Sequence, residues 1–292
     1  MICDSIGIVG FGLIGSSIAH NIRDRKLAGH IACVDQDTDV CRYVLDADLA
    51  DTASHKAAVL ANCDIIFICV PVGAVKFVMQ EITPYLKQGS VITDVGSVKT
   101  QVIHDITNQL PSSVSYVPGH PMAGTEFSGP QAGFASLFAD KKWLLTPMND
   151  TPLQSVELIE KFCTAMGANV HILPGDLHDK IVAMTSHLPQ LISYIVMNTA
   201  EDMEGDIGHE IIPYSANGFH GFARIAASDP IMWRDVYLTN TDNVLDVIER
   251  FEDGLKAMKT AITSKDHGAM FDYFKKSRDC RLDYLRKKGE LK

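Results

Sequence analysis

Residues 5–17 contain the feature that most constrains the fold of this chain. An apolar run leads into three glycines with the spacing G-x-G-x-x-G, and an amphipathic segment follows. In a strand–turn–helix unit of this kind, the first glycine permits a tight turn and the second lets the backbone approach a pyrophosphate. The third allows the helix to pack closely on the strand. The pattern predicts a dinucleotide-binding loop with contacts from Gly10, Gly12, Leu13, Ile14 and Gly15.

Short apolar runs alternate with amphipathic segments through the first half of the chain. We expect strands at residues 5–10, 30–35, 63–70, 90–95 and 113–118, and two further strands at 143–147 and 169–173. Strands that alternate with helices indicate a mostly parallel sheet that is covered on both faces. The predicted fold class is therefore α/β, with a Rossmann-type doubly wound sheet in the N-terminal part.

The pattern changes after Pro174 and Gly175, where helical periodicity replaces the strand signals. We therefore predict an NAD-binding Rossmann-type domain at 1–174 and an all-α domain at 175–292. The apolar stripes of the second half are wide for a lone surface, which indicates burial against a second copy of the chain. A homodimer formed through the helical domain is the expected assembly.

The second predicted strand ends in Asp35, where a carboxylate would bind the hydroxyls of the adenosine ribose. A 2′-phosphate would instead meet Asp35 and Asp37, and neither residue has an arginine or a lysine next to it. The sequence thus favours NAD over NADP as the cofactor. Further cofactor contacts are expected from Val70, Pro71 and Ser97.

Composition excludes several classes of partner. The formal net charge of −10 disfavours nucleic acid and anionic membranes, and no apolar run reaches the roughly 18 residues of a membrane span. The seven cysteines are scattered without a CxxC pair, which indicates reduced thiols and neither a disulfide framework nor a metal site. Because the first residues also lack a secretory signature, we expect a cytoplasmic protein.

Two polar residues follow predicted strands at the carboxyl edge of the sheet. Ser97 comes after the fourth strand and His120 after the fifth. Ligands of doubly wound sheets bind at this edge, so we expect both side chains to meet a substrate beside the nicotinamide. NAD-linked oxidation of an alcohol needs a base, for which histidine has a suitable pKa, and a neighbouring hydroxyl can orient it. Between Gly119 and Pro121, neither a helix nor a central strand is expected to continue; the alternative role is a structural histidine that caps a loop.

Four further segments carry a resemblance to a known family. They are TDVGSVK at 93–99, HPMAGTEFSG at 120–129, TSHLPQ at 185–190 and RIAASDPIMWRD at 224–235. Together with the glycine loop, they closely resemble the prephenate and arogenate dehydrogenases of tyrosine biosynthesis. The resemblance implies an oxidoreductase that uses NAD to oxidise a cyclohexadienol with loss of carbon dioxide. The product would be 4-hydroxyphenylpyruvate from prephenate, or tyrosine from arogenate. Hydride removal leaves a dienone that accepts the electrons of the breaking C–C bond, so the ring becomes aromatic.

The resemblance also implies roles for particular residues. His120 would accept the proton of the ring hydroxyl with help from Ser97, and Arg224 would pair with a substrate carboxylate in a bidentate contact. The other implied substrate contacts are Thr125, Glu126, His187 and Trp233. Thr125 and Glu126 would lie near the nicotinamide and the mouth of the site, and His187 would approach from the helical half.

Each of these contacts has a plainer alternative. Arg224 could form a surface ion pair, and Trp233 could be an ordinary core residue. His187 could be a helix histidine whose nitrogens are satisfied within the protein, and Glu126 could be a solvated loop residue.

The chain departs from the family pattern near the expected site for the substrate side chain. Family members commonly carry GFRDFTRIA, whereas this chain reads GFHGFARIA at 218–226. His220 and Gly221 thus replace an arginine–aspartate pair, and Ala223 replaces a threonine. Gln190 stands where histidine is frequent. Prephenate has a pyruvyl side chain and arogenate an amino-acid one, so the preferred substrate stays open, and an enzyme that accepts both fits as well.

Two other functions stay open. The β-hydroxyacid type of NAD dehydrogenase also joins a Rossmann domain to a helical partner, but it uses a lysine followed three residues later by asparagine. Here Lys180 is followed at that spacing by Ala183. A non-catalytic dinucleotide sensor would retain the fold but would not require Ser97, His120 and Arg224 together.

Overall fold

The computed structural model describes residues 1–125 and 127–291. The chain divides into two compact units, Met1–Val244 and Leu245–Lys292. Throughout the described ranges, no helix is both long enough and apolar enough to cross a membrane.

The larger sheet forms the centre of the first unit. Its order within the described residues is β3-β2-β1-β4-β5-β6, and each neighbouring pair is parallel. The strands are β1 (Cys3–Val9), β2 (Ala28–Val34), β3 (Thr52–Ser54), β4 (Ile65–Ile68), β5 (Val91–Asp94) and β6 (Ser115–Val117). The order reverses between β1 and β4, which is the switch point of a doubly wound sheet. The predicted α/β fold class is confirmed, and β3 is a short strand that the sequence analysis missed.

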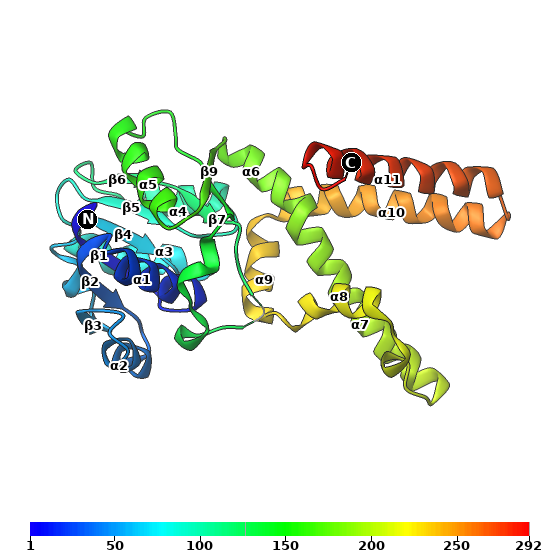
Figure 1. Cartoon of the computed structure of the whole chain (residues 1–292), viewed down its shortest axis with the longest axis horizontal. Coiled ribbons are helices and arrows are strands. Elements are labelled where there is room, and N and C mark those ends of the chain that lie inside the picture. The colour runs from blue at the N-terminus through cyan, green and yellow to red at the C-terminus, as the bar shows by residue number, and fades with distance from the viewer. Residues whose placement is uncertain (126, 292) are drawn as a thin grey trace. The chain divides into compact units, whose positions relative to one another are not determined.

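Helices cover both faces of this sheet, as Figure 1 shows for its blue to green part. The covering helices are α1 (Leu13–Arg25), α2 (Thr38–Asp46), α3 (Val75–Ile82), α4 (Thr100–Thr107) and α5 (Leu153–Ala165). Alternate residues of each buried strand point to opposite faces. In β4, Phe67 packs in one hydrophobic cluster with residues of α1 and α5, whereas Ile66 packs in the other with residues of α3 and α4. The central strands are apolar on both faces for this reason.

The glycine loop connects β1 to α1, as predicted. Gly10 has φ +88°, and a Cβ there would lie 2.7 Å from the carbonyl oxygen of Cys69. A Cβ at Gly15 would lie 2.1 Å from the carbonyl oxygen of Gly10, so helix and loop pack too closely for any side chain. Gly12, the N-cap of α1, differs because a Cβ there would meet nothing within 4 Å. Gly10 and Gly15 are therefore required for close packing, and Gly12 keeps a space open at the N-terminus of α1.

A smaller sheet follows, with the order β7-β8-β9. It consists of β7 (Gly119–Pro121), β8 (Lys142–Leu145) and β9 (Asn169–Ile172), with β7 antiparallel to β8 and β8 parallel to β9. The sequence predicted that neither a helix nor a central strand continues at His120, and the structure has a short edge strand there, in which His120 pairs with Leu144. Proline is tolerated because β7 is an edge strand, where a missing N–H breaks no ladder.

After β9 the described residues form helices and turns. The helices are α6 (Gly175–Val182), α7 (Leu188–Ile207), α8 (Asn217–Ala223), α9 (Pro230–Thr239), α10 (Thr241–Thr263) and α11 (His267–Lys287). A π-helical turn, η6 (Ala183–His187), joins α6 to α7. The remaining short turns are η1 (Ala57–Leu60), η2 (Val72–Ala74), η3 (Thr83–Tyr85), η4 (Pro130–Ala132), η5 (Ala135–Phe138), η7 (Ile212–Tyr214) and η8 (Arg224–Ala227). The expectation of an all-α second part is confirmed.

The second unit consists of most of α10 together with α11. The two helices lie side by side in Figure 1. Asp266 is the N-cap of α11, and its carboxylate accepts a hydrogen bond from the Ala269 N–H at 2.9 Å. Many large apolar side chains of this unit are exposed, among them Leu255, Ile262, Phe271 and Phe274. Their exposure leaves apolar surface that a lone helix pair does not bury.

The glycine loop generates a stability prediction. Replacing Gly15 with alanine forces a backbone shift, so we expect the free energy of unfolding to fall by about 1–3 kcal/mol. Gly12→Ala is the matched control, because its added methyl group enters open space. Chemical denaturation of both variants measures the difference. An equal loss of stability in the two would contradict the packing role of Gly15.

Candidate active site

His120 occupies a buried position immediately after the carboxyl end of β6. The residue is 9% exposed. Its Nδ1 atom lies 2.8 Å from Nε2 of His178, and the two rings share a hydrogen bond. Burial lowers the pKa of His120 well below its usual range, and the nearby His178, Lys99 and His187 lower it further. The imidazole is therefore neutral near pH 7 and able to accept a proton.

A buried carboxylate connects the strand of His120 to the loop after β5. Asp94 accepts hydrogen bonds from the Gly96 N–H at 2.8 Å and from the Gly119 N–H at 3.1 Å. It also accepts the hydroxyl of Tyr116 at 2.8 Å and pairs with the Nζ atom of Lys99. Lys99 Nζ in turn donates to the Gly119 carbonyl at 2.6 Å. These contacts fix the two segments that carry Ser97 and His120 relative to each other.

Asp179 of α6 connects the same loop to the helical part. Its carboxylate accepts the backbone N–H groups of Lys99 at 2.7 Å and Thr100 at 2.8 Å, and it hydrogen-bonds Nδ1 of His178 at 2.8 Å. Burial alone would raise the pKa of Asp179, but the hydrogen bonds from His178, Thr100 and Lys99 hold it below its usual value. The side chain is therefore a carboxylate, and with His178 it forms the buried side of α6. Lys180, the next residue, is exposed.

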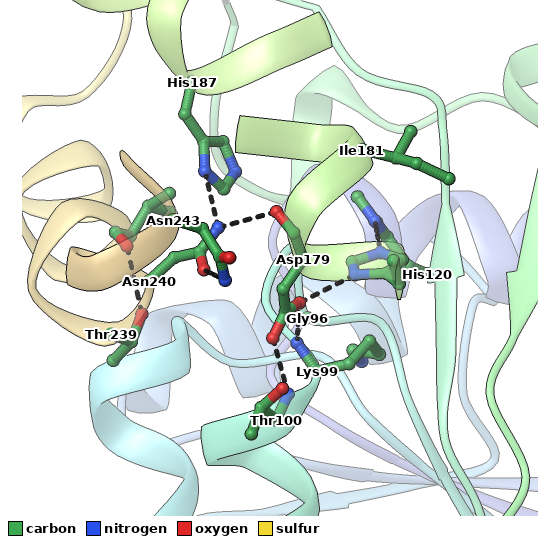
Figure 2. Close-up of polar contacts among 12 residues, drawn as sticks. Gly96, Lys99, Thr100, His120, Asp179, Ile181, His187, Thr239, Asn240 and Asn243 are labelled. Carbon is green, nitrogen blue, oxygen red and sulfur yellow. Dashed lines mark hydrogen bonds and ion pairs between the residues drawn. The ribbon is translucent and has the colours of Figure 1, made fainter. Parts of the chain in front are cut away.

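His187 lies in the π-helical turn and belongs to the same network, as Figure 2 shows. The Nδ2 atom of Asn240 lies 3.3 Å from its Nδ1 atom and 3.0 Å from the carbonyl oxygen of Asp179. Burial lowers the pKa of His187 to about 4, an effect that Asp179 opposes in part. The Nε2 atom of His187 and the Nε1 atom of Trp233 are both buried without a hydrogen-bond partner among the described residues. The rings of His187 and Trp233 meet edge to face, with centroids 6.0 Å apart.

The structure says less about the roles of the other predicted site residues. Ser97 is half-buried and, within the described residues, makes no hydrogen bond to His120. Thr125 is exposed, and its hydroxyl accepts the Phe127 N–H at 3.2 Å. Arg224 is exposed at the start of η8. Glu126 lies outside the described residues, so its predicted role stays a prediction, as do those of Ser97, Thr125 and Arg224.

Side chains of α7 hold the segment that carries Arg224. Gln190 is buried, and its Nε2 atom donates to the Ile225 carbonyl at 2.7 Å. Ser193 donates to the Phe222 carbonyl at 3.1 Å, and Tyr194 to the Ser228 carbonyl at 3.1 Å. Gln190, a departure from the family pattern, thus supports the backbone after the arginine, and Ser193 supports it before the arginine. His220 is exposed and hydrogen-bonds the Ser215 hydroxyl at 3.0 Å.

The β1–α1 loop has the features that a dinucleotide needs. The space at Gly12 opens onto the N-terminus of α1, where unpaired N–H groups favour a phosphate. Asp35 at the end of β2 lies beside this loop, and its Oδ2 atom accepts the Phe11 N–H at 2.9 Å. The carboxylate is thereby held at the edge of the loop where a ribose would follow the phosphate. Gly10, Gly12, Gly15 and Asp35 are brought together as predicted, and the residues fit a dinucleotide.

His178, Asp179 and Asn240 are the site residues that the sequence analysis missed. A consecutive His–Asp pair in the first turns of the first helix after Pro174 was the available signal, because this helix begins beside the β5 loop. Asn240 lies between α9 and α10 and carries no motif signal of its own. Its role follows only from the approach of α9 to α6.

Comparisons with known proteins agree with this geometry. Residues 18–172 match the family model for the nucleotide-binding domain of prephenate dehydrogenase, and residues 174–276 match the model for its dimerization domain. A cyclohexadienyl dehydrogenase from Zymomonas mobilis is 36% identical, over 95% of this chain and 94% of its own length. A prephenate dehydrogenase from Bacillus subtilis is 30% identical, over 99% of this chain and 78% of its own.

A solved structure is also similar along the whole chain. It is the prephenate dehydrogenase of Aquifex aeolicus in complex with hydroxyphenyl propionate and NAD+. The TM-score is 0.90 at 30% sequence identity, and the likeness covers 96% of this chain and 98% of the other. With matching models over both halves and relatives similar along nearly its full length, this chain belongs to the prephenate dehydrogenase family.

Proposed function

We propose that this protein is an NAD-dependent dehydrogenase that oxidatively decarboxylates prephenate, arogenate or both in tyrosine biosynthesis. Its relatives include enzymes named cyclohexadienyl dehydrogenase and prephenate dehydrogenase, and the Aquifex aeolicus enzyme was solved with NAD+ and hydroxyphenyl propionate. The observation that carries the proposal is the buried, neutral His120 at the carboxyl edge of a doubly wound sheet. This edge is where such folds bind their ligands.

The glycine loop and Asp35 would hold the cofactor. Gly12 leaves room for the pyrophosphate at the N-terminus of α1, and Asp35 would accept hydrogen bonds from the ribose hydroxyls. The same carboxylate would repel the 2′-phosphate of NADP. The other proposed contacts, around the ring systems of the cofactor, are Leu13, Ile14, Val70, Pro71 and Ser97. When bound, NAD supplies the acceptor for the hydride that leaves the carbon bearing the ring hydroxyl.

His120 would act on the proton of that hydroxyl. Its ring is neutral and fixed by His178, so it can accept the proton as the hydride departs. After carbon dioxide has left and the ring has become aromatic, the same imidazole can return the proton to the phenol oxygen. Burial around His120 excludes bulk water, which would otherwise compete for this hydrogen bond.

The helical half would bind the rest of the substrate. The Nε2 atom of His187 and the Nε1 atom of Trp233 are buried without a hydrogen-bond partner among the described residues, and as N–H donors they would suit the oxygen atoms of a substrate carboxylate or carbonyl. Arg224 would pair with a carboxylate from the segment that Gln190 supports. Thr125 and Glu126 remain proposed residues at the mouth of the site.

The β-hydroxyacid alternative requires a catalytic lysine on the helix that follows the sheet. The lysine of this helix, Lys180, is exposed, whereas His178 and Asp179 form the buried side. A dinucleotide sensor would have no need for a buried base held by a second imidazole. These observations favour a prephenate or arogenate dehydrogenase over both alternatives.

The function is tested by following NADH formation with prephenate and with arogenate, each with NAD and with NADP. We expect turnover with at least one of the two substrates and a preference for NAD.

His120→Asn should lower kcat roughly 10²–10⁴-fold with little change in NAD affinity, because it removes the proton acceptor and leaves the glycine loop intact. Activity confined to 3-hydroxy acids, or an unchanged kcat in the variant, would refute the proposal.

Asp35 generates a prediction about cofactor choice. Asp35→Ala should raise the KM for NAD and reduce the preference for NAD over NADP, because it removes both the ribose acceptor and the charge that repels a 2′-phosphate. Asp39→Ala, an exposed change in α2, is the control. The measurement is kcat/KM with each cofactor. Unaltered selectivity in Asp35→Ala would show that the ribose lies elsewhere.

We further propose that the chain is organised as domains 1–174 and 175–292 and forms a homodimer through the second. Exposed apolar side chains in α7, including Ile195, Met203 and Ile207, support this assembly, as does the dimerization-domain model that matches residues 174–276.

All seven cysteines are free thiols, which supports a cytoplasmic location.

The proposed assembly predicts a particle of twice the mass of the 32.0 kDa chain. Burial of the exposed apolar residues is the driving force, so the dimer should persist at micromolar concentration. Light scattering coupled to gel filtration measures the mass directly. A monomer at that concentration would contradict the proposal.

A further inference from the structure

We propose that His178, Asp179 and Asn240 are positioning residues that fix opposite tautomers in the two site histidines. His120 would present a bare Nε2 atom, ready to accept a proton, and His187 would present a protonated Nε2 atom, ready to donate. The catalytic meaning of this arrangement rests on the proposed dehydrogenase function. The tautomers themselves follow from the hydrogen bonds of the protein together with neutral imidazole rings.

The first branch starts at the Asp179 carboxylate. This group only accepts hydrogen bonds, so Nδ1 of His178, 2.8 Å away, must carry a proton. In a neutral His178 ring the Nε2 atom is then an acceptor, and it lies 2.8 Å from Nδ1 of His120. His120 must therefore donate from Nδ1, which leaves its Nε2 atom with a free lone pair. A second proton on His178 would reverse this contact and place the His120 proton on Nε2, so the proposal requires a neutral His178 ring.

The second branch starts at the Asn240 side chain. The Asp179 carbonyl can only accept a hydrogen bond, so it must face Nδ2 and fixes the orientation of the amide; Oδ1 then accepts from Nδ2 of Asn243 at 2.8 Å. The Nδ2 atom then donates one hydrogen to the Asp179 carbonyl at 3.0 Å and the other toward Nδ1 of His187 at 3.3 Å. The Nδ1 atom of His187 is thus an acceptor. Because the pKa of His187 is about 4, the ring is neutral near pH 7 and its single proton lies on Nε2.

The buried Nε2 atom of His187 is the observation that points to a ligand. It has no hydrogen-bond partner among the described residues, although a buried donor normally has one. The side chain is fully buried, and the backbone carbonyl of His187 is held by the Tyr237 hydroxyl at 3.2 Å. A substrate oxygen would satisfy this donor. His187 would then hold an oxygen of the substrate while His120 receives a proton from another.

Asp179 couples the two branches because it takes part in both. Its carboxylate sets the His178–His120 pair, and its backbone carbonyl accepts the hydrogen bond from Asn240 (Figure 2). The same carboxylate binds two backbone N–H groups at the start of α4. One residue thus fixes the position of α6 and the direction of two hydrogen bonds. A protonated Asp179 carboxyl group could donate to Nδ1 of His178. The donor and the acceptor would then be exchanged in both hydrogen bonds of the first branch.

The direct test is nuclear magnetic resonance of the full chain with 15N-labelled histidine, recorded near pH 7 without substrate. Long-range proton–nitrogen correlations identify which ring nitrogen is protonated. His120→Asn, His178→Gln and His187→Gln assign the signals. We expect protons on Nδ1 of His120 and His178 and on Nε2 of His187. A proton on Nε2 of His120, a proton on Nδ1 of His187, or averaged tautomers in either ring would overturn the proposal.

Kinetics provide a second test through a rescue comparison. The amide oxygen of Gln can accept the hydrogen bond from His120, whereas Leu cannot, so His178→Gln should retain at least about 10-fold more kcat than His178→Leu. Affinity for NAD should stay within about twofold in both, because neither variant touches the glycine loop. His104→Gln, an exposed change in α4, is the control. Equal kcat values for the two folded His178 variants would overturn the positioning role.

The two tests separate this inference from the proposed function. The tautomers are read from the protein alone, without turnover. If the expected tautomers are found but no variant or wild-type protein oxidises prephenate or arogenate, the function is wrong and the hydrogen-bond assignment stands. If turnover is found but His120 carries its proton on Nε2, the positioning residues have been wrongly assigned.

Discussion

The site depends on the buried ion pair between Asp94 and Lys99. Both groups are removed from water, so each needs the other, and losing one partner would leave an uncompensated charge in the core. The pair also uses its remaining hydrogen-bonding capacity on the backbone of Gly96 and Gly119. The cost of burying the charges is thereby offset by contacts that join β5, β6 and β7. Rigid placement of His120 follows, because its strand cannot shift without breaking these bonds.

Burial has a second consequence for the chemistry of the site. It disfavours charge on an imidazole, so His120 and His187 are both neutral, and His187 is neutral although Asp179 raises its pKa in part. Neutral imidazoles have one donor and one acceptor nitrogen each, and the partner on one nitrogen decides the role of the other. His178, which is held by Asp179, is the partner of Nδ1 in His120, and Asn240 is the partner of Nδ1 in His187. The protein can therefore give two identical side chains different tasks in one small volume.

Much of the fold could be predicted from local sequence. The predicted strands in the first half correspond to β1, β2, β4, β5 and β6, because buried parallel strands need continuous apolar runs and glycines mark the first turn. β3 and β7 were missed, since three residues carry little pattern and Pro121 argues against a strand wherever its edge position is unknown. In the site, the role of Ser97 beside His120 stays a prediction, and the hydrogen bond that the structure gives the imidazole goes to His178. Sequence order alone could not bring residue 178 to residue 120.

The sequence by itself determined the doubly wound sheet, the glycine loop with Asp35, and the presence of a histidine at the carboxyl edge. These features follow from periodicity and from residue types that act within one turn or strand, so neighbouring positions suffice to specify them. Only the tertiary structure decided which groups surround that histidine. The packing of α6 and α9 beside the β5 loop brings His178 to His120 and Asn240 to His187 across long stretches of chain. A hydrogen bond requires its two heavy atoms to lie within about 3 Å of each other. A local sequence pattern does not show which residues far apart in the chain come this close.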